Sequence, residues 1–130
     1  MLQQTQVKTV IPFYSRWIEQ FPDFNSVATA HLDSLLKFWE GLGYYNRCKN
    51  FRKAVKIIVN NYNSSLPDNI EDFKDLPGVG EYTAAAVYSI VLSHPIPVID
   101  VNVNRVMSRL LQIKLHTPHN KKSLLSTQTK

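Results

Sequence analysis

The fold of this chain is decided by the stretch Leu76-Pro77-Gly78-Val79-Gly80-Glu81-Tyr82-Thr83-Ala84. Two glycines separated by one apolar residue allow the backbone to turn tightly through conformations that other residues resist. A short helix is expected ahead of this turn, over residues 70–74, and a helix rich in small residues is expected after it, over residues 81–92. The pattern therefore predicts two helices joined by a tight hairpin.

The amides of such a hairpin suggest what it binds. Backbone N–H groups at the start of a helix point outward and carry partial positive charge, so they can hold a phosphate. The alternative is a Pro-Gly loop that only joins two helices. The leucine and proline ahead of the glycines and the small residues behind them favour DNA phosphate. Fixed amides read no bases, which predicts affinity without sequence specificity.

The rest of the chain is also expected to be helical, as a bundle of mutually inclined helices, so the predicted fold class is all-α. Because Pro12 suits a first turn, the first regular helix is expected to begin near it and to end at residues 21–23. Further helices are expected over residues 23–30, 32–40, 45–62 and 100–111. The first helix is expected to bury one apolar face with three-and-four spacing: Val7, Val10, Ile11, Tyr14, Trp17, Ile18 and Phe21.

Length and composition indicate one globular domain. The chain has 130 residues, of which 44% are hydrophobic and 19% charged. We expect a helical domain over residues 1–113 and a loose polar tail over 114–130. No apolar run reaches the ~18 residues of a membrane span, and no export signal opens the chain, so we expect no membrane association. The net charge of +5 suits a polyanionic partner.

Asp100 precedes a periodic apolar helix, and two interpretations of it remain open. An aspartate at this place is most often a helix N-cap. It could also place a carboxylate beside a displaced nucleotide, where it would stabilise positive charge developing on the sugar. The two roles are compatible.

Two further stretches carry possible chemistry. In Gly41-Leu42-Gly43-Tyr44-Tyr45-Asn46-Arg47, the paired tyrosines could present an aromatic wedge to DNA, or they could be core tyrosines after a helix C-cap. In Met1-Leu2-Gln3-Gln4-Thr5-Gln6-Val7, the glutamines offer amide donors and acceptors to a base edge. Cys48 is the only cysteine, which excludes an internal disulfide, and we expect it to be a packing thiol. The four histidines show no metal-ligand spacing, so no metal site is expected.

These four stretches resemble, in the same order and without an obvious gap from Met1 to about Leu111, the adenine DNA glycosylases. These are the MutY-like branch of the helix–hairpin–helix (endonuclease III) superfamily. The resemblance implies base-excision repair: removal of adenine mispaired with 8-oxoguanine or guanine by hydrolysis of the N-glycosidic bond. The implied partner is double-stranded DNA with a mispaired or damaged base, bound by a monomer.

The resemblance also implies roles for individual residues. Asp100 would stabilise the oxocarbenium-like sugar, with Asn102 orienting its surroundings, and Gln4 and Tyr44 would wedge the duplex where bases are displaced. The other residues implied to act are Leu2, Thr5 and Val7 in the adenine pocket and Gly78, Val79, Gly80 and Tyr82 along the DNA. Relatives that also cut the backbone carry a Schiff-base lysine where this chain has Tyr82, so a monofunctional glycosylase is expected.

Three departures from the family accompany the resemblance. The family's general-acid glutamate would precede Met1, and the four cysteines of its 4Fe-4S cluster would follow this domain. We therefore expect a fragment truncated at both ends, without a cofactor of its own and with marginal stability. Val101 also stands where the family usually has glycine.

Two alternatives stay open beside the adenine glycosylase. One is a non-catalytic DNA-binding module that uses only the hairpin and the basic helix face. The other is a related glycosylase for thymine mismatches, because tyrosine at position 82 also occurs there. The expected location is cytoplasmic and nucleoid-associated in a bacterium, or nuclear or mitochondrial in a eukaryote.

Overall fold

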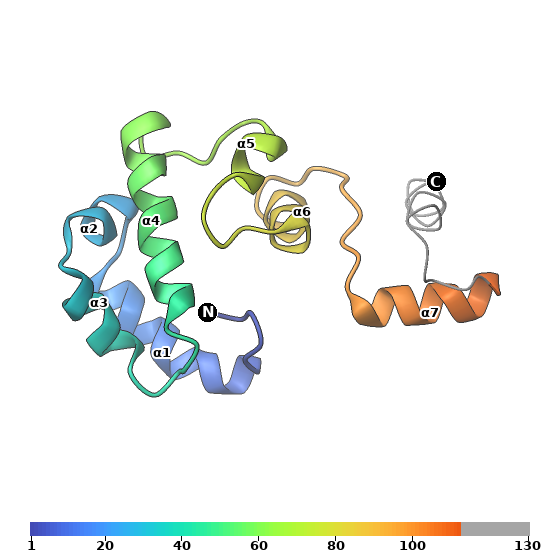
Figure 1. Ribbon diagram of the computed structural model, residues 1–130, viewed down its shortest axis with the longest axis horizontal. Helices are drawn as coiled ribbons and strands as arrows, with labels where there is room; N and C mark the ends of the chain where they lie inside the picture. Colours follow the sequence, from blue (N-terminus) through green and yellow to red (C-terminus); the bar gives the residue numbers. More distant parts are fainter. Residues whose placement is uncertain (113–130) are drawn as a thin grey trace. The chain divides into compact units, whose positions relative to one another are not determined.

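The computed structural model describes residues 1–112, which form helices and the connections between them, without strands (Figure 1). The predicted all-α fold class is confirmed. The predicted tail over residues 114–130 lies outside the described residues. The helices are α1 (Val7–Gln20), α2 (Phe24–Thr29), α3 (Leu32–Trp39), α4 (Asn46–Asn61), α5 (Ile70–Lys74), α6 (Glu81–Ile90) and α7 (Val101–Leu111).

The chain divides into two compact units, and the division falls inside the glycine hairpin. The first unit comprises residues 1–78 and contains α1 to α5, while the second begins at Val79 and contains α6 and α7. The single domain expected over residues 1–113 stays a prediction.

The first unit is built around α4, which contacts both α2 and α3, while α1 contacts α3 (Figure 1). Trp17 on α1 lies among other aromatic rings, with its centroid 5.5 Å from that of Trp39 and 5.0 Å from that of Phe21. Such tilted and edge-on pairs contribute about 0.5–1.5 kcal/mol each beyond the area they bury. The apolar core consists of Val10, Trp17, Phe21, Val27, Leu35, Trp39, Leu42, Cys48 and Val55.

The start of α1 differs from the prediction. The helix begins at Val7 and contains Pro12, so the expectation that it starts near Pro12 is wrong. Proline removes one backbone hydrogen bond from a helix, but the turn ahead of it keeps its own. The amides of Thr9 and Val10 both donate to the Gln6 carbonyl at 3.1 Å, and Val10 is buried in the core. Burial of Val10 thus holds the first turn in place.

The apolar face of α1 also differs from the prediction. Of the seven residues expected to be buried, only Val10, Trp17 and Phe21 are. The apolar stripe is wider than the contact with the neighbouring helices, so the remainder faces outward. The exposed members are Val7, Ile11, Tyr14 and Ile18.

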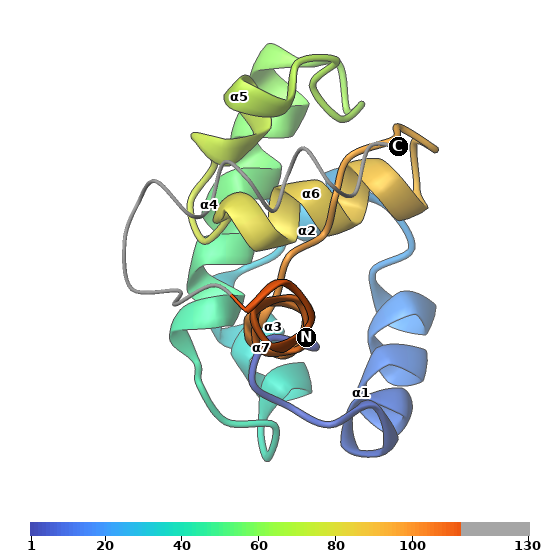
Figure 2. The same ribbon diagram turned by 90° about the vertical axis from the view of Figure 1, so that its right-hand side faces the viewer.

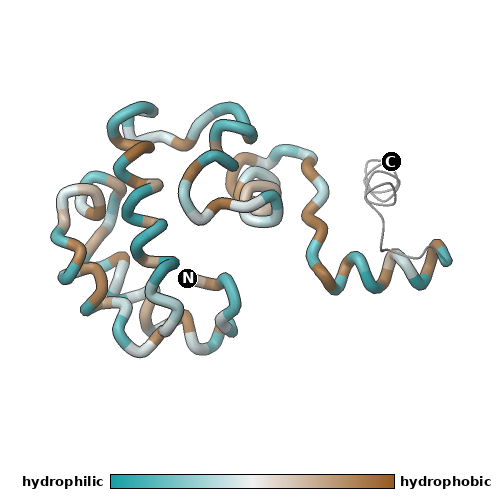
Figure 3. The backbone as a smooth tube through the Cα atoms, in the orientation of Figure 1, coloured by the Kyte–Doolittle hydropathy of each residue, from teal (hydrophilic) through white to brown (hydrophobic). Residues whose placement is uncertain are grey.

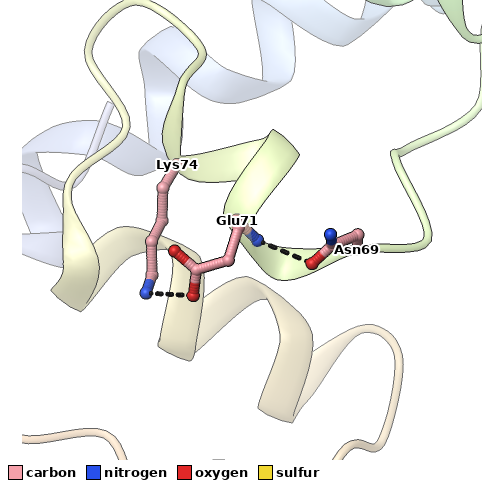
Figure 4. Close-up of polar contacts among 3 residues, drawn as sticks. All are labelled: Asn69, Glu71 and Lys74. Carbon is pink, nitrogen blue, oxygen red and sulfur yellow. Dashed lines mark hydrogen bonds and ion pairs between the residues drawn. The ribbon is translucent and has the colours of Figure 1, made fainter.

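Local capping explains where the short helices begin. Asp23 and Ser26 form a capping box, in which the Ser26 amide donates to Asp23 Oδ1 at 2.7 Å. In α5, Asn69 Oδ1 accepts the Glu71 amide at 3.0 Å, and Lys74 Nζ lies 2.9 Å from Glu71 Oε1 (Figure 4). These contacts stabilise a five-residue helix directly ahead of the hairpin.

In the second unit, the buried residues of α6 are Ala84, Ala85 and Tyr88. The chain then turns at His94, whose amide donates to the Tyr88 carbonyl at 3.0 Å. No residue of α7 is buried, although its sequence is amphipathic. Figure 2 views α7 nearly end-on, and Figure 3 shows apolar and polar positions alternating along it. Among residues 1–112, no helix is long and apolar enough to cross a membrane.

Candidate functional site

The hairpin at residues 76–80 has one glycine that its conformation requires and one that leaves open space. Gly78 has a φ of +81°, and a Cβ there would lie 2.9 Å from Asn50 Cβ. Gly80 is extended, acts as the N-cap of α6, and would have no atom within 4 Å of an added Cβ. A side chain added at Gly80 would therefore meet no atom at the N-terminus of α6, where backbone amides can bind an anion.

Gln4 and Tyr44 share an unusual backbone. Gln4 has a φ of 58° and Tyr44 a φ of 51°, both in the left-handed region. Such a conformation costs a residue other than glycine about 1–3 kcal/mol and persists only where the surroundings impose it. Tyr44 is 61% exposed and Tyr45 44% exposed, so the alternative interpretation of these tyrosines as core residues is wrong.

Arg47 on α4 holds the backbone around both of these residues. Its Nη1 donates to the Met1 carbonyl at 2.6 Å and also to the Gln3 carbonyl. Its Nη2 donates to the Gly43 carbonyl at 3.1 Å. The guanidinium also lies over the Tyr44 ring, 5.1 Å from its centroid, in a cation–π contact. The sequence interpretation missed Arg47, whose only signal was its place directly after the glycine–tyrosine turn.

The three residues expected to line a base pocket lie on the same N-terminal segment as Gln4. The Thr5 amide donates to the Leu2 carbonyl at 3.2 Å, which makes a turn, and Leu2 and Val7 are exposed. The Thr5 hydroxyl oxygen is buried and has no hydrogen-bond partner within the described part of the chain. These residues, Gln4, Tyr44 and Gly78 all belong to the first unit.

Asp100 in the second unit caps α7, which confirms its interpretation as an N-cap. Its Oδ1 accepts the Val103 amide at 2.7 Å, and its Oδ2 accepts Asn102 Nδ2 at 3.1 Å. Asn102 is held in turn by Arg105 Nη2, which donates to its Oδ1 at 3.0 Å. The hydrogen bond from Val103, followed by that from Asn102, lowers the pKa of Asp100, so its carboxylate is ionised at neutral pH. Val101 beside it is exposed.

Tyr82 is the second residue of α6 and is half-exposed. Its phenol has no amine and cannot form an imine with an aldehyde sugar. Five of the predicted site residues belong to the second unit: Val79, Gly80, Tyr82, Asp100 and Asn102. The other predicted site residues belong to the first unit.

The chain does not fit a four-cysteine cluster. Its one cysteine, Cys48, is completely buried, and burial raises the pKa of its thiol to about 11. Within residues 1–112, no three His, Cys, Asp or Glu side chains gather as metal ligands.

Comparison with known proteins identifies the family. The model described as HhH-GPD superfamily base excision DNA repair protein matches residues 1–129. The chain belongs to the HhH-GPD superfamily. The resemblance to the helix–hairpin–helix glycosylases is thereby confirmed at the level of the family, and the helix–hairpin–helix fold with it.

Relatives within the HhH-GPD superfamily are named adenine DNA glycosylase. That of Buchnera aphidicola subsp. Baizongia pistaciae (strain Bp) is 39% identical over 127 residues, which cover 98% of this chain and 36% of the relative. That of Homo sapiens is 40% identical over 114 residues, which cover 87% of this chain and 21% of the relative. The chain thus spans about a third or less of the length of these relatives.

Solved structures of HhH-GPD proteins share the fold. A thermostable thymine-DNA glycosylase matches with a TM-score of 0.85 at 24% identity, covering 98% of this chain and 60% of that one. A trapped endonuclease III–DNA covalent intermediate in an estranged-adenine complex matches with a TM-score of 0.81 at 26% identity, covering 89% of this chain and 55% of that one.

Proposed function

We propose that this chain supplies the DNA-binding and base-displacing part of an adenine DNA glycosylase, which removes adenine opposite 8-oxoguanine or guanine. The observation that carries the proposal is the agreement of the relatives: proteins 36–43% identical over 84–98% of the chain are named adenine DNA glycosylase. Double-stranded DNA with a mispaired base is the proposed partner, and a monomer the proposed form.

Binding begins at the hairpin. Gly78, Val79 and Gly80 present backbone amides to a DNA phosphate, and the open space at Gly80 lets the phosphate approach. Tyr82 lies along the DNA backbone beside them. Exposed Tyr44 and Gln4 enter the base stack, where an aromatic ring replaces part of the lost stacking, about 1–3 kcal/mol per base. Leu2, Thr5 and Val7 line the pocket for the displaced adenine.

The reaction breaks the bond between adenine and its sugar. As that bond lengthens, positive charge develops on the sugar, and the ionised Asp100 carboxylate stabilises it, held in place by Asn102. A water molecule adds to the sugar carbon and releases a proton to solvent, while the departing adenine takes up a proton from a general acid. The family supplies that acid from a glutamate ahead of the position of Met1, so we assign the role to no residue of this chain.

The proposal is tested by single-turnover release of adenine from a labelled duplex that carries adenine opposite 8-oxoguanine. The chain is compared with a version extended at its N-terminus to add a glutamate two residues ahead of Met1. We expect the extended chain to release adenine faster by about 10²–10⁴-fold, the usual contribution of a general acid. Absence of release by the extended chain, with duplex binding retained, would refute the proposed reaction.

A non-catalytic DNA-binding module remains a second candidate, because α4 carries exposed Lys49, Lys53 and Lys56 in the unit that also holds Gly78. Salt-dependent duplex binding without preference for a mismatch would favour it. A thymine-mismatch glycosylase is a third candidate, which a panel of mismatched substrates tests. For location we propose cytoplasm and nucleoid in a bacterium, or nucleus or mitochondrion in a eukaryote.

A further inference from the structure

Gln4 and Tyr44, two residues of the first unit with left-handed backbone, have a feature in common that the family match does not supply. Gln4 follows the Gln3 carbonyl and Tyr44 follows the Gly43 carbonyl. One guanidinium, that of Arg47, donates to both of these carbonyls, through Nη1 to Gln3 and through Nη2 to Gly43. The peptide group directly ahead of Gln4 and the one directly ahead of Tyr44 are therefore held by the same side chain.

Gln3 extends this connection to the hairpin. Its Nε2 donates to the Gly78 carbonyl at 3.2 Å, across a separation of 75 residues. Gly78 also lies close to Asn50 on α4, because a Cβ added at Gly78 would be 2.9 Å from Asn50 Cβ. Backbone and side-chain hydrogen bonds thus run from the Tyr44 turn through Arg47 and Gln3 to the hairpin.

We propose that Arg47 is a positioning residue for base displacement. It holds Gln4 and Tyr44 in their left-handed conformations and, through Gln3, sets their position relative to the hairpin at Gly78. This inference rests on the proposed function, in which Gln4 and Tyr44 enter the base stack. Arg47 itself touches no DNA in this scheme, so its effect is exerted through the backbone of the two wedge residues.

An arginine is required because of its shape. The planar guanidinium carries donors that diverge in a fixed fork, whereas a lysine ammonium is a single point on a flexible stem. A lysine can keep the positive charge and a hydrogen bond to one of the two carbonyls, but it cannot hold two backbone segments at a fixed separation. Arg47→Lys therefore removes the geometry and preserves the net charge.

The same helix offers a matched control. Arg52 also donates twice to a backbone carbonyl, that of Ala30, through Nε at 3.2 Å and Nη2 at 3.0 Å. The Ala30 carbonyl belongs to the connection between α2 and α3, which is part of neither the hairpin nor the glycine–tyrosine turn. Arg52→Lys makes the same chemical change on α4 without disturbing Gln4 or Tyr44.

The experiment has one arm without DNA and one with DNA. In the free chain, amide hydrogen exchange is followed over residues 1–6 and 42–46. In the complex, a duplex carries 2-aminopurine opposite 8-oxoguanine, and its fluorescence rises when the base leaves the stack. Duplex affinity and its salt dependence are measured for every variant.

We expect Arg47→Lys to speed exchange in both segments by about tenfold and to lower the fluorescence gain severalfold, a loss comparable with one stacking contact. Affinity for undamaged duplex and its salt dependence should stay within about twofold, because the charge and the hairpin are unchanged. Arg52→Lys should leave both segments and the fluorescence at their original values. Gln3→Met, an exposed change that removes the donor to Gly78, should lower the fluorescence gain while the chain remains folded.

The outcomes distinguish failure of the proposed role of Arg47 from failure of the proposed base displacement. Unchanged exchange and fluorescence in Arg47→Lys, or equal losses in Arg52→Lys, would overturn the role of Arg47. If Arg47→Lys does not fold, an unchanged fluorescence gain in Gln3→Met overturns it instead. A chain that binds the duplex but leaves 2-aminopurine stacked would overturn the proposed base displacement, while the exchange arm would still decide whether Arg47 holds the two segments.

Discussion

Asn102 donates its side-chain amide to Oδ2 of Asp100 at 3.1 Å, and this leaves the other carboxylate oxygen of Asp100 to cap α7. One residue thus begins a helix and carries an oriented negative charge. The two roles can be separated by substitution, because asparagine caps a helix about as well as aspartate but has no charge.

We expect Asp100→Asn to keep the stability of the chain within a few tenths of a kcal/mol and to abolish adenine release by the N-terminally extended chain. Asp100→Ala should lose the release and also about 0.5–2 kcal/mol of stability, because the cap is lost. Urea unfolding and single-turnover kinetics measure the two effects. Full activity in Asp100→Asn would leave Asp100 as a helix cap only.

The pKa of Asp100 predicts a dependence of stability on pH. Because hydrogen bonds from Val103 and Asn102 lower the pKa in the folded chain, the carboxylate stabilises the fold above its unfolded-state pKa, about 3.9. This contribution is lost as the pH falls through the lower, folded-state pKa. We expect the stability difference between the chain and Asp100→Ala to shrink below about pH 4, as measured by urea unfolding at several pH values. A difference that grows on acidification would contradict the assignment.

The two hairpin glycines should respond differently to alanine. Gly78→Ala meets Asn50 at 2.9 Å and places a side chain at a φ of +81°, so we expect a loss of about 1–3 kcal/mol in the free energy of unfolding. Gly80→Ala adds a Cβ into open space at an ordinary φ, and stability should hardly change. That Cβ stands where the phosphate would approach, so duplex affinity should fall. Urea unfolding and fluorescence anisotropy distinguish the two variants, and equal affinities for Gly80→Ala and the original chain would argue against a phosphate at this turn.

Tyr82 predicts the chemistry at the sugar after base release. Without an amine at this position, we expect no covalent protein–DNA adduct when the extended chain is treated with borohydride during the reaction. An endonuclease III that carries the Schiff-base lysine serves as the positive control on its own substrate. An adduct in high yield would show that another amine of this chain attacks the sugar.

Cys48 should behave as a buried packing thiol. It is fully buried, and the raised pKa of about 11 keeps it protonated at pH 8, so a thiol reagent should modify it only through unfolding. We expect slow modification in buffer and complete modification in urea. Cys48→Ser, which buries a hydroxyl, should cost about 1–3 kcal/mol, and Cys48→Ala should isolate the part due to lost volume. Rapid modification of the folded chain would place Cys48 at the surface.

Helices were predictable wherever the signal is local. The helix predicted over residues 70–74 is observed as Ile70–Lys74, and that predicted over 45–62 as Asn46–Asn61. Asp100 was recognised as a cap because a cap and its amide are three residues apart. Pro12 misled the prediction because its effect on α1 depends on burial of Val10, which packs against residues distant in the sequence.

Burial was less predictable than helicity. The periodicity of α1 specifies which residues share a face, but it does not say how much of that face another helix covers. Four of its apolar residues are consequently exposed, where the sequence predicted burial: Val7, Ile11, Tyr14 and Ile18.

By itself, the sequence determined the all-α class, the hairpin at Gly78 and the family, because turn glycines, caps and ordered motifs act over a few residues. Only the tertiary structure decided that Gln4 and Tyr44 adopt left-handed backbone and that Arg47 holds both. Arg47 donates to the carbonyls of Gln3 and Gly43, although in the sequence it is 44 residues from Gln3 and 4 residues from Gly43. A hydrogen bond between distant segments depends on how the helices pack, and no local pattern encodes it.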